Sequence, residues 1–255
     1  MSLLAVRGLR KAFGGVHAVD GMEFDVAPGE AVALIGPNGA GKTTCFNMLG
    51  GQLRPDAGSI RFGGKELAGL APHQICRLGV GRTFQVAATF PSMTARENVQ
   101  TTMLSHRRRL WSVWPPARKQ FVEETDALLG KVGMAADADR ASGILSYGDL
   151  KRLDLAMALA GDPRILLMDE PTAGVAVAER HALMELIVGI VRERHISVLF
   201  TEHDMDVVFG HAARVIVMHR GKIVTQGPPD AVCADAKVKE IYLGHGDDPG
   251  RGVSG

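Results

Sequence analysis

A nine-residue stretch with few side chains, "GPNGAGKTT" at residues 36–44, has the spacing of a phosphate-binding loop. Glycines at such positions let backbone N–H groups turn toward phosphate oxygens, and the helix that follows presents the positive end of its dipole. In this pattern the lysine reaches the terminal phosphates and the next hydroxyl binds Mg²⁺. The sequence therefore predicts a phosphate and Mg²⁺ site formed by Gly36, Pro37, Asn38, Gly39, Ala40, Gly41, Lys42, Thr43 and Thr44.

A pair of acidic residues follows an apolar run further along the chain, in "RILLMDEP". Asp169 stands at the end of this run, where its carboxylate can hold Mg²⁺ through a water molecule. The adjacent Glu170 can reach the water that attacks a γ-phosphate. Acidic pairs also begin loops or cap helices, but the phosphate-binding loop upstream favours the catalytic interpretation. At this stage kinases, switch GTPases and motor ATPases all remain open.

The residues around both motifs have the patterns of strands and helices that would position them. "GEAVALIG" predicts a buried strand before the loop, and "KTTCFNMLGGQL" predicts a helix after it that ends at two glycines. "RILLMD" and "ISVLFTEH" are further candidates for buried strands, and "VAERHALMELIVGIVRER" between them predicts a helix. This order of strand, helix and strand indicates an α/β fold with a parallel sheet.

Other regions have different patterns. The first thirty residues and "RVIVMHRGKIVTQG" alternate in period two around glycine turns, which predicts antiparallel strands in a smaller sheet beside the parallel one. Residues from about 96 to 160 have an interrupted helical pattern and predict a helical subdomain. Residues 245–255 predict a flexible tail, because they are rich in glycine and charge. We expect a single domain over residues 1–244.

The composition is that of an ordinary globular chain. Its 29 basic and 28 acidic residues give a formal net charge of +1, so the overall charge does not direct it toward nucleic acid. The three cysteines are far apart and form no CxxC pair, which argues against a disulfide framework or a zinc site and favours a reducing compartment. No apolar run reaches eighteen residues, and the N-terminal "MSLLAVRGLRKAF" alternates like a strand rather than a signal peptide. Work at a membrane would then depend on other subunits.

Five motifs in sequence order resemble those of the ATP-binding subunits of ABC transporters. They are "GPNGAGKTT", "GRTFQ", "LSYGDLKRLDLAMAL", "ILLMDEP" and "TEHD", and the resemblance covers nearly the whole chain. A guanine-reading NKxD does not follow the central strands, which argues against a GTPase. The resemblance implies a P-loop NTPase core of the ABC type, with a parallel sheet, a small antiparallel β subdomain and a helical subdomain. It also implies hydrolysis of ATP with Mg²⁺.

The resemblance implies roles for single residues within one chain. Phe13 matches the aromatic residue that stacks on adenine, although a core aromatic on a strand is the plain alternative. His203 matches the histidine that contacts the γ-phosphate. Gln85 matches the glutamine that touches Mg²⁺ or the attacking water and signals to membrane subunits. The expected catalytic set is Lys42, Gln85, Glu170 and His203, and the expected metal set is Thr43, Gln85 and, through water, Asp169.

The family signature at residues 145–159 implies a second chain. Ser146 and Gly148 match positions that bind the γ-phosphate of ATP held by the opposite subunit, with Asp149 as the next signature residue. Two chains would hold two ATP molecules head to tail. Asp149 replaces the usual glutamine, and we expect it to point away from phosphate, since the helix dipole favours an acid in the first turn. Ala176 replaces the usual Asp or Asn, which suggests a weakened contribution to the neighbouring site.

Within the family, the sequence resembles most the ATP-binding subunits of branched-chain amino-acid importers, in "LRKAFGGVHAVDG", "DEPTAGV" and "TEHDMDVV". This implies a peripheral position on the cytoplasmic face of the inner membrane. The expected partners are permease subunits, a second ATP-binding subunit that is a paralogue or another copy, and, indirectly, a periplasmic substrate-binding protein; no nucleic acid is expected. The alternatives are an ATPase for lipid or lipopolysaccharide export, and a non-transport ABC protein that acts on nucleic acid or ribosomes.

A basic segment with both tryptophans, Trp111 and Trp114, lies at residues 105–119. It is either a solvated lid of the helical subdomain or a docking element for a permease loop or the lipid headgroups. Nucleic-acid binding is a third option, but a single basic cluster supports it poorly.

Overall fold

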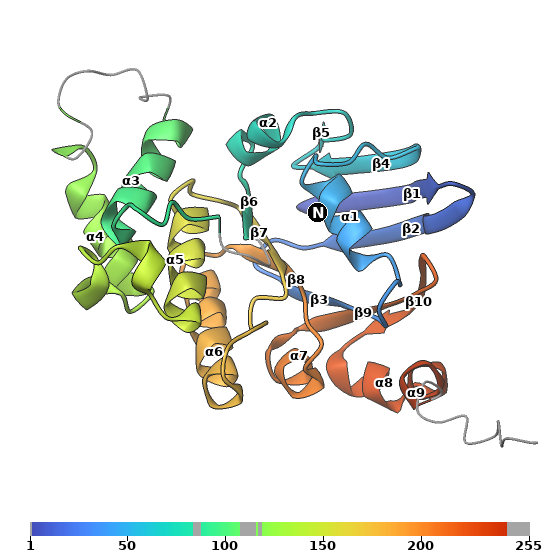
Figure 1. Ribbon diagram of the computed structural model, residues 1–255. Helices are drawn as coiled ribbons and strands as arrows, with labels where there is room; N and C mark the ends of the chain where they lie inside the picture. Colours follow the sequence, from blue (N-terminus) through green and yellow to red (C-terminus); the bar gives the residue numbers. More distant parts are fainter. Residues whose placement is uncertain (1, 84–87, 108–115, 117–118, 244–255) are drawn as a thin grey trace, which may run out of the picture.

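The computed structural model describes residues 2–83, 88–107, 116 and 119–243. Two sheets organise it, as Figure 1 shows. The larger sheet has the strand order β10-β9-β3-β8-β7-β6, and the smaller has the order β2-β1-β4-β5. The strands are β1 (Leu4–Phe13), β2 (Val16–Val26), β3 (Ala31–Ile35), β4 (Ala57–Phe62), β5 (Lys65–Glu66), β6 (Val80–Thr83), β7 (Ile165–Asp169), β8 (Ser197–Thr201), β9 (Arg214–His219) and β10 (Lys222–Gly227).

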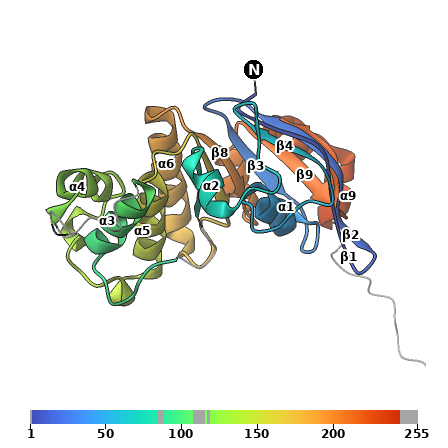
Figure 2. The ribbon, with the colours of Figure 1, turned by 90° about the horizontal axis from the view of Figure 1, so that it is seen from above.

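The helices flank these sheets. Helices α3 to α6 gather toward one end of the molecule and the smaller sheet lies toward the other (Figures 1 and 2). The described helices are α1 (Lys42–Leu49), α2 (Pro72–Arg77), α3 (Ala95–His106), α4 (Val122–Lys131), α5 (Tyr147–Leu159), α6 (Val177–Glu193), α7 (Met205–His211), α8 (Pro229–Ala234) and α9 (Ala236–Leu243). Within the described ranges, none of them is long and apolar enough to cross a lipid bilayer.

Alternate residues of the larger sheet face two different cores. In β3, Ala33 and Ile35 pack into a cluster with helices α3 to α7, whereas Val32 and Leu34 pack against α1 and the smaller sheet. Successive side chains of a strand point to opposite faces, so β3 is buried on both sides. Burial on both faces explains the continuous apolar runs that predicted buried strands. The predicted α/β fold class is confirmed.

One part of the sheet prediction is wrong. The segment "RVIVMHRGKIVTQG" does form an antiparallel pair, β9 and β10, but this pair belongs to the larger sheet, where β9 runs parallel to β3. Residues 215–218 of β9 are completely buried, whereas β10 is partly exposed at the edge. The alternation seen in the sequence comes from this edge strand, and the apolar run of β9 marks a strand covered on both faces.

The range predicted as a helical subdomain contains α3, α4 and α5, which contact one another. The boundaries of a separate subdomain stay a prediction. The predicted tail at residues 245–255 lies outside the described residues, as do Trp111 and Trp114.

Candidate functional site

The loop between β3 and α1 is pressed against the backbone of two strands. A Cβ atom on Gly36 would lie 2.2 Å from the carbonyl oxygen of Met218 in β9, and one on Gly41 would lie 2.1 Å from that of Ala18 in β2. Both glycines also have positive φ, 154° and 104°. Any side chain at either position would displace the loop, so the two glycines set its path.

Lys42 begins α1 and is buried, with 7% of its surface exposed. Its Nζ donates to the carbonyl oxygens of Gly36, at 2.6 Å, and Pro37, at 3.3 Å. Burial lowers the pKa of the Lys42 ammonium, while the nearby charges of Glu170 and Asp169 act in the opposite direction. The loop thus wraps around a cation that stands at the positive end of a helix.

The ends of β7 and β8 hold the acidic pair. The Thr201 hydroxyl donates to Oδ1 of Asp169 at 2.7 Å, and the backbone N–H of Glu170 donates to Thr201 Oγ1 at 3.0 Å. Glu170 adopts a left-handed backbone conformation with φ of 50°, which costs about 1–3 kcal/mol for a residue with a side chain. Its Oε1 lies 2.7 Å from Nε2 of His203. Such strain is typical of functional sites.

These elements line one open cleft of about 330 Å³. The cleft is polar on the loop side and bounded by Phe13, whose ring is half exposed and lies 5.6 Å from Nζ of Lys11. The structure thus brings together most of the predicted site residues, and it adds Ala18, for which the sequence gives no signal because it contributes backbone. The residues around the cleft are Phe13, Ala18, Asn38, Gly39, Ala40, Gly41, Lys42, Thr43, Thr44, Glu170 and His203.

The cleft and the acidic residues beside it suit a nucleoside triphosphate with Mg²⁺. The glycines hold the loop against β2 and β9 at the start of α1, and the buried Lys42 supplies positive charge for an anion at this helix N-terminus. The hydroxyl of Thr43 in the cleft and the carboxylate of Asp169, which is buried next to Glu170 and does not line the cleft, are hard oxygen donors of the kind that Mg²⁺ prefers. Mg²⁺ commonly takes only one or two protein ligands and completes its shell with phosphates and water.

The predicted signature residues do not line this cleft. Ser146 caps the start of α5: its Oγ accepts from the backbone N–H of Asp149 at 3.2 Å, and its hydroxyl donates to Oδ2 of Asp149 at 2.6 Å. The carboxylate of Asp149 is therefore engaged with Ser146. The two basic residues that follow have other contacts, since Lys151 is buried beside Tyr147 and Arg152 donates to the carbonyl oxygen of Val132.

Two other predicted positions stand apart. Gln85 lies outside the described residues. Ala176 occupies the position before α6 where a polar side chain would cap the helix, and no side chain caps it.

Comparisons with known proteins agree with this geometry. A family model described as "ABC transporter" matches residues 19–173. The chain is 36% identical over 249 residues to the high-affinity branched-chain amino acid transport ATP-binding protein BraF of Pseudomonas aeruginosa, covering 95% of this chain and 98% of that protein. It is 37% identical over 250 residues to the corresponding protein LivG of Escherichia coli, with the same coverage.

A solved structure has the same fold. The ADP conformation of MJ1267, an ATP-binding cassette of an ABC transporter, superimposes with a TM-score of 0.86 at 31% identity, over 96% of this chain and 99% of that one. Fold, cleft and motifs thus define an ATP-binding cassette. The chain belongs to the ABC transporter family.

The tight packing of the loop against β2 leads to one testable prediction. Gly41→Ala would force a Cβ into the carbonyl of Ala18 and should abolish binding of a fluorescent ATP analogue, while the larger core stays folded. Gly189→Ala is the matched control, because a Cβ on Gly189 in α6 meets nothing within 4 Å. Equilibrium titration and thermal unfolding of both variants test this, and full binding by Gly41→Ala would contradict it.

Proposed function

We propose that this chain is the ATP-binding and ATP-hydrolysing subunit of a membrane importer for branched-chain or related amino acids. The observation that carries the proposal is the pairing of Glu170 with His203, 2.7 Å apart, in the same cleft as the phosphate-binding loop. The named functions of BraF and LivG, each similar over nearly its whole length, support the choice of cargo class.

Each residue has a part in this proposal. Phe13 stacks on the adenine, residues 36–44 surround the phosphates, and Lys42 exchanges its contacts with the loop carbonyls for contacts with the terminal phosphates. Thr43 and Asp169 would hold Mg²⁺, Asp169 through water. The bound ion would neutralise negative charge on the phosphates.

Hydrolysis depends on a positioned base. Glu170 accepts the proton of the attacking water, and its strained backbone aims the carboxylate at the cleft. His203 contacts the γ-phosphate and holds Glu170 in place until nucleotide binds. Gln85 joins this set as a ligand of Mg²⁺ or water. The reaction then converts ATP and water into ADP and phosphate.

The functional unit is a head-to-tail dimer with a second ATP-binding subunit, either a paralogue or another copy. Ser146 and Gly148 complete the site of the opposite chain, and this places Asp149 near the same triphosphate. Exposed apolar side chains lie at the start of α5 (Ile144 and Tyr147) and at the start of α6 (Val177), and they fit a surface that another subunit covers.

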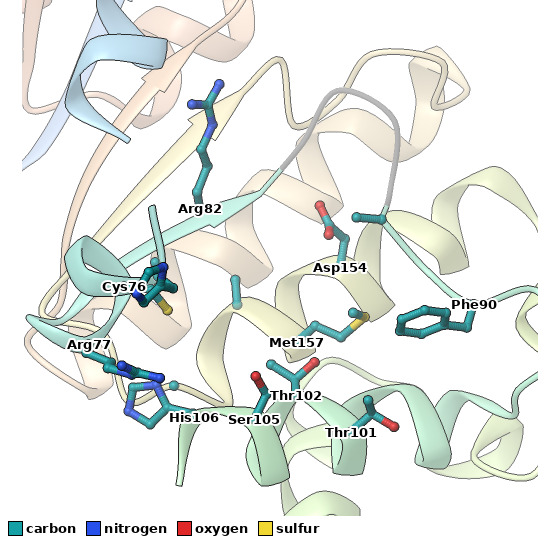
Figure 3. A pocket seen from close by; sticks show the side chains of 15 residues that line it. Cys76, Arg77, Arg82, Phe90, Thr101, Thr102, Ser105, His106, Asp154 and Met157 are labelled. Carbon is teal, nitrogen blue, oxygen red and sulfur yellow. The ribbon is translucent and has the colours of Figure 1, made fainter. Parts of the chain in front are cut away.

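The permease subunits need a docking surface, and a cavity of about 370 Å³ fits this role. It opens between α2 and β6 on one side and α3 and α5 on the other, and its lining includes the apolar side chains of Met157 and Phe90 and the hydroxyls of Thr102 and Ser105 (Figure 3). Arg77 and further basic residues also line it. This mixture suits a cytoplasmic permease loop that carries an apolar side chain and an acidic one.

The alternatives remain distinguishable. A lipid exporter would place the same motor on different permeases, and a non-transport ABC protein would purify with ribosomes or nucleic acid instead. In the importer that we propose, the chain lies at the cytoplasmic face of the inner membrane, with a periplasmic binding protein as an indirect partner.

The first prediction concerns the base. Glu170→Gln should lower the ATP turnover by about 10²–10⁴-fold, because loss of a general base costs this much, and should trap a nucleotide-bound dimer. Steady-state phosphate release and size-exclusion chromatography with ATP measure both effects. Glu240→Gln, at an exposed position on α9, is the control. Rapid turnover by Glu170→Gln would refute the assignment of the base.

The second prediction concerns docking. Ser105→Arg places a long cation on the exposed wall of the α3–α5 cavity and should remove the permeases that co-purify with the tagged chain from gently solubilised membranes. ATP binding should not change. Ala127→Arg on the exposed side of α4 is the control, since Ala127 does not line the cavity. Retention of two permeases by Ser105→Arg, identified by mass spectrometry, would exclude this docking surface.

The third prediction concerns dimer asymmetry. If Ala176 weakens the neighbouring site, Ala176→Asp should raise the ATPase activity of the assembled complex. Asp would also cap α6 and stabilise it by about 1 kcal/mol, so Ala176→Ser serves as a control that adds a cap without a charge. Equal activity of the Asp variant, the Ser variant and the wild type would remove the basis for asymmetry.

A further inference from the structure

Five charged side chains are buried in the part of the chain that the structure describes: Lys42, Lys151, Asp154, Asp169 and Glu202. Three are carboxylates and two are cations, and burial of a charge is costly unless charges or hydrogen bonds compensate it. Lys42 belongs to the phosphate-binding loop. Lys151 is a buried cation to which the proposed nucleotide site gives no role.

Lys151 lies on α5, one turn beyond the start of that helix, with 6% of its surface exposed. Its Nζ is 5.7 Å from the ring centre of Tyr147. The side chain lines a small cavity of about 10 Å³ together with Asp154, with Met168 in β7 and with Pro171 in the loop that follows it. The side chain of Lys151 thus extends from α5 to the segment that holds Asp169 and Glu170.

The surroundings of Lys151 are acidic on several sides. Burial lowers the pKa of its ammonium, and the charges of Asp154, Glu202, Glu170 and Asp169 act in the opposite direction. These carboxylates come from α5 and from the ends of β7 and β8. The ammonium of Lys151 therefore lies in the electrostatic field of carboxylates from three separate elements, and its side chain lines one small cavity with Asp154 and with Met168 and Pro171, which flank the acidic pair.

The hydroxyls near these carboxylates do not supply charge. Thr172 donates to Oε1 of Glu202 through both its backbone N–H and its hydroxyl, each at 2.7 Å, and Thr201 donates to Asp169. Neutral donors satisfy lone pairs but leave the net negative charge in place. The nearby cations must compensate it.

We infer that Lys151 is a positioning residue of the hydrolytic site, which compensates the carboxylates at the ends of β7 and β8 and thereby ties α5 to Asp169 and Glu170. This inference rests on the proposed function, in which Lys42 turns to the terminal phosphates when ATP binds. Lys151 does not line the nucleotide cleft, so it would keep its position on α5 throughout the cycle. It couples the position of α5, which carries Ser146, to the geometry of the base.

The test uses the purified full chain and its ATPase activity. Lys151→Met keeps most of the stem and removes the charge; it should lower kcat by about 10- to 100-fold, as expected for a misplaced base, with KM for ATP changed by less than about twofold. Lys151→Arg keeps the charge and should recover most of this loss. Lys131→Met, at a surface lysine paired with Glu193, should behave like the wild type.

A structural role predicts a different pattern. Equal kcat for Lys151→Met and Lys131→Met, or a Lys151→Arg variant as slow as Lys151→Met, would overturn the inference. The double variant Lys151→Met/Asp154→Asn removes one charge of each sign and should restore the thermal unfolding temperature while kcat stays low. Recovery of kcat together with stability would show that the lysine only balances the core.

Two measurements separate this inference from the proposed function. Affinity for a fluorescent ATP analogue should be unchanged in Lys151→Met, because the lysine does not line the nucleotide cleft. If Glu170→Gln abolishes turnover and Lys151→Met does not lower kcat, only the inference fails. If Glu170→Gln hydrolyses ATP normally, the proposed function fails first. If Lys151→Met does not fold, two other variants test the inference. Lys151→Arg should keep most of the wild-type kcat, and the double variant Lys151→Met/Asp154→Asn should fold but keep a low kcat.

Discussion

The close approach of the phosphate-binding loop to the carbonyls of Ala18 and Met218 is the constraint on which the site depends. The two strands that supply these carbonyls belong to different sheets, β2 to the smaller and β9 to the larger. The loop can therefore adopt its path only when both sheets are packed together. This packing buries the apolar residues of α1, of β1 and of one face of β3 in one cluster. The free energy of that core thus holds a loop that has few side chains of its own.

The acidic half of the site depends on strand register. Asp169 and Thr201 are partners in the parallel pairing of β7 with β8, so the same register that buries Leu167 beside Leu199 brings the hydroxyl to the carboxylate. A shift of one residue would turn every side chain to the other face. Glu170 directly follows this buried strand, and its backbone N–H donates to Thr201 at the end of β8. These surroundings hold Glu170 in its left-handed backbone conformation.

Much of this arrangement could be predicted from the sequence because its causes are local. Residues 36–44 contain the glycines, the lysine and the hydroxyl of one continuous loop, and Asp169 and Glu170 directly follow a strand whose apolar run is visible. The sheet that receives β9 and β10 could not be assigned from alternation alone, because pairing with β3 is a long-range event. Ala18 was missed because its contribution is a carbonyl oxygen. The hydrogen bond between Ser146 and Asp149 depends on side-chain rotamers, which spacing does not determine.

The placement of charge connects the two halves of the molecule. Lysine is seldom fully buried without a partner, yet the described core holds one lysine at the start of α1 and another inside α5. The charges of Asp169 and Glu170 act on both lysines, which belong to different helices. In the proposed mechanism ATP and Mg²⁺ would change the charge around Lys42 and Asp169, whereas Lys151 does not line the nucleotide cleft and would keep its place in α5. Under that proposal, a displacement of α5 would change the electrostatic field at Asp169 and Glu170.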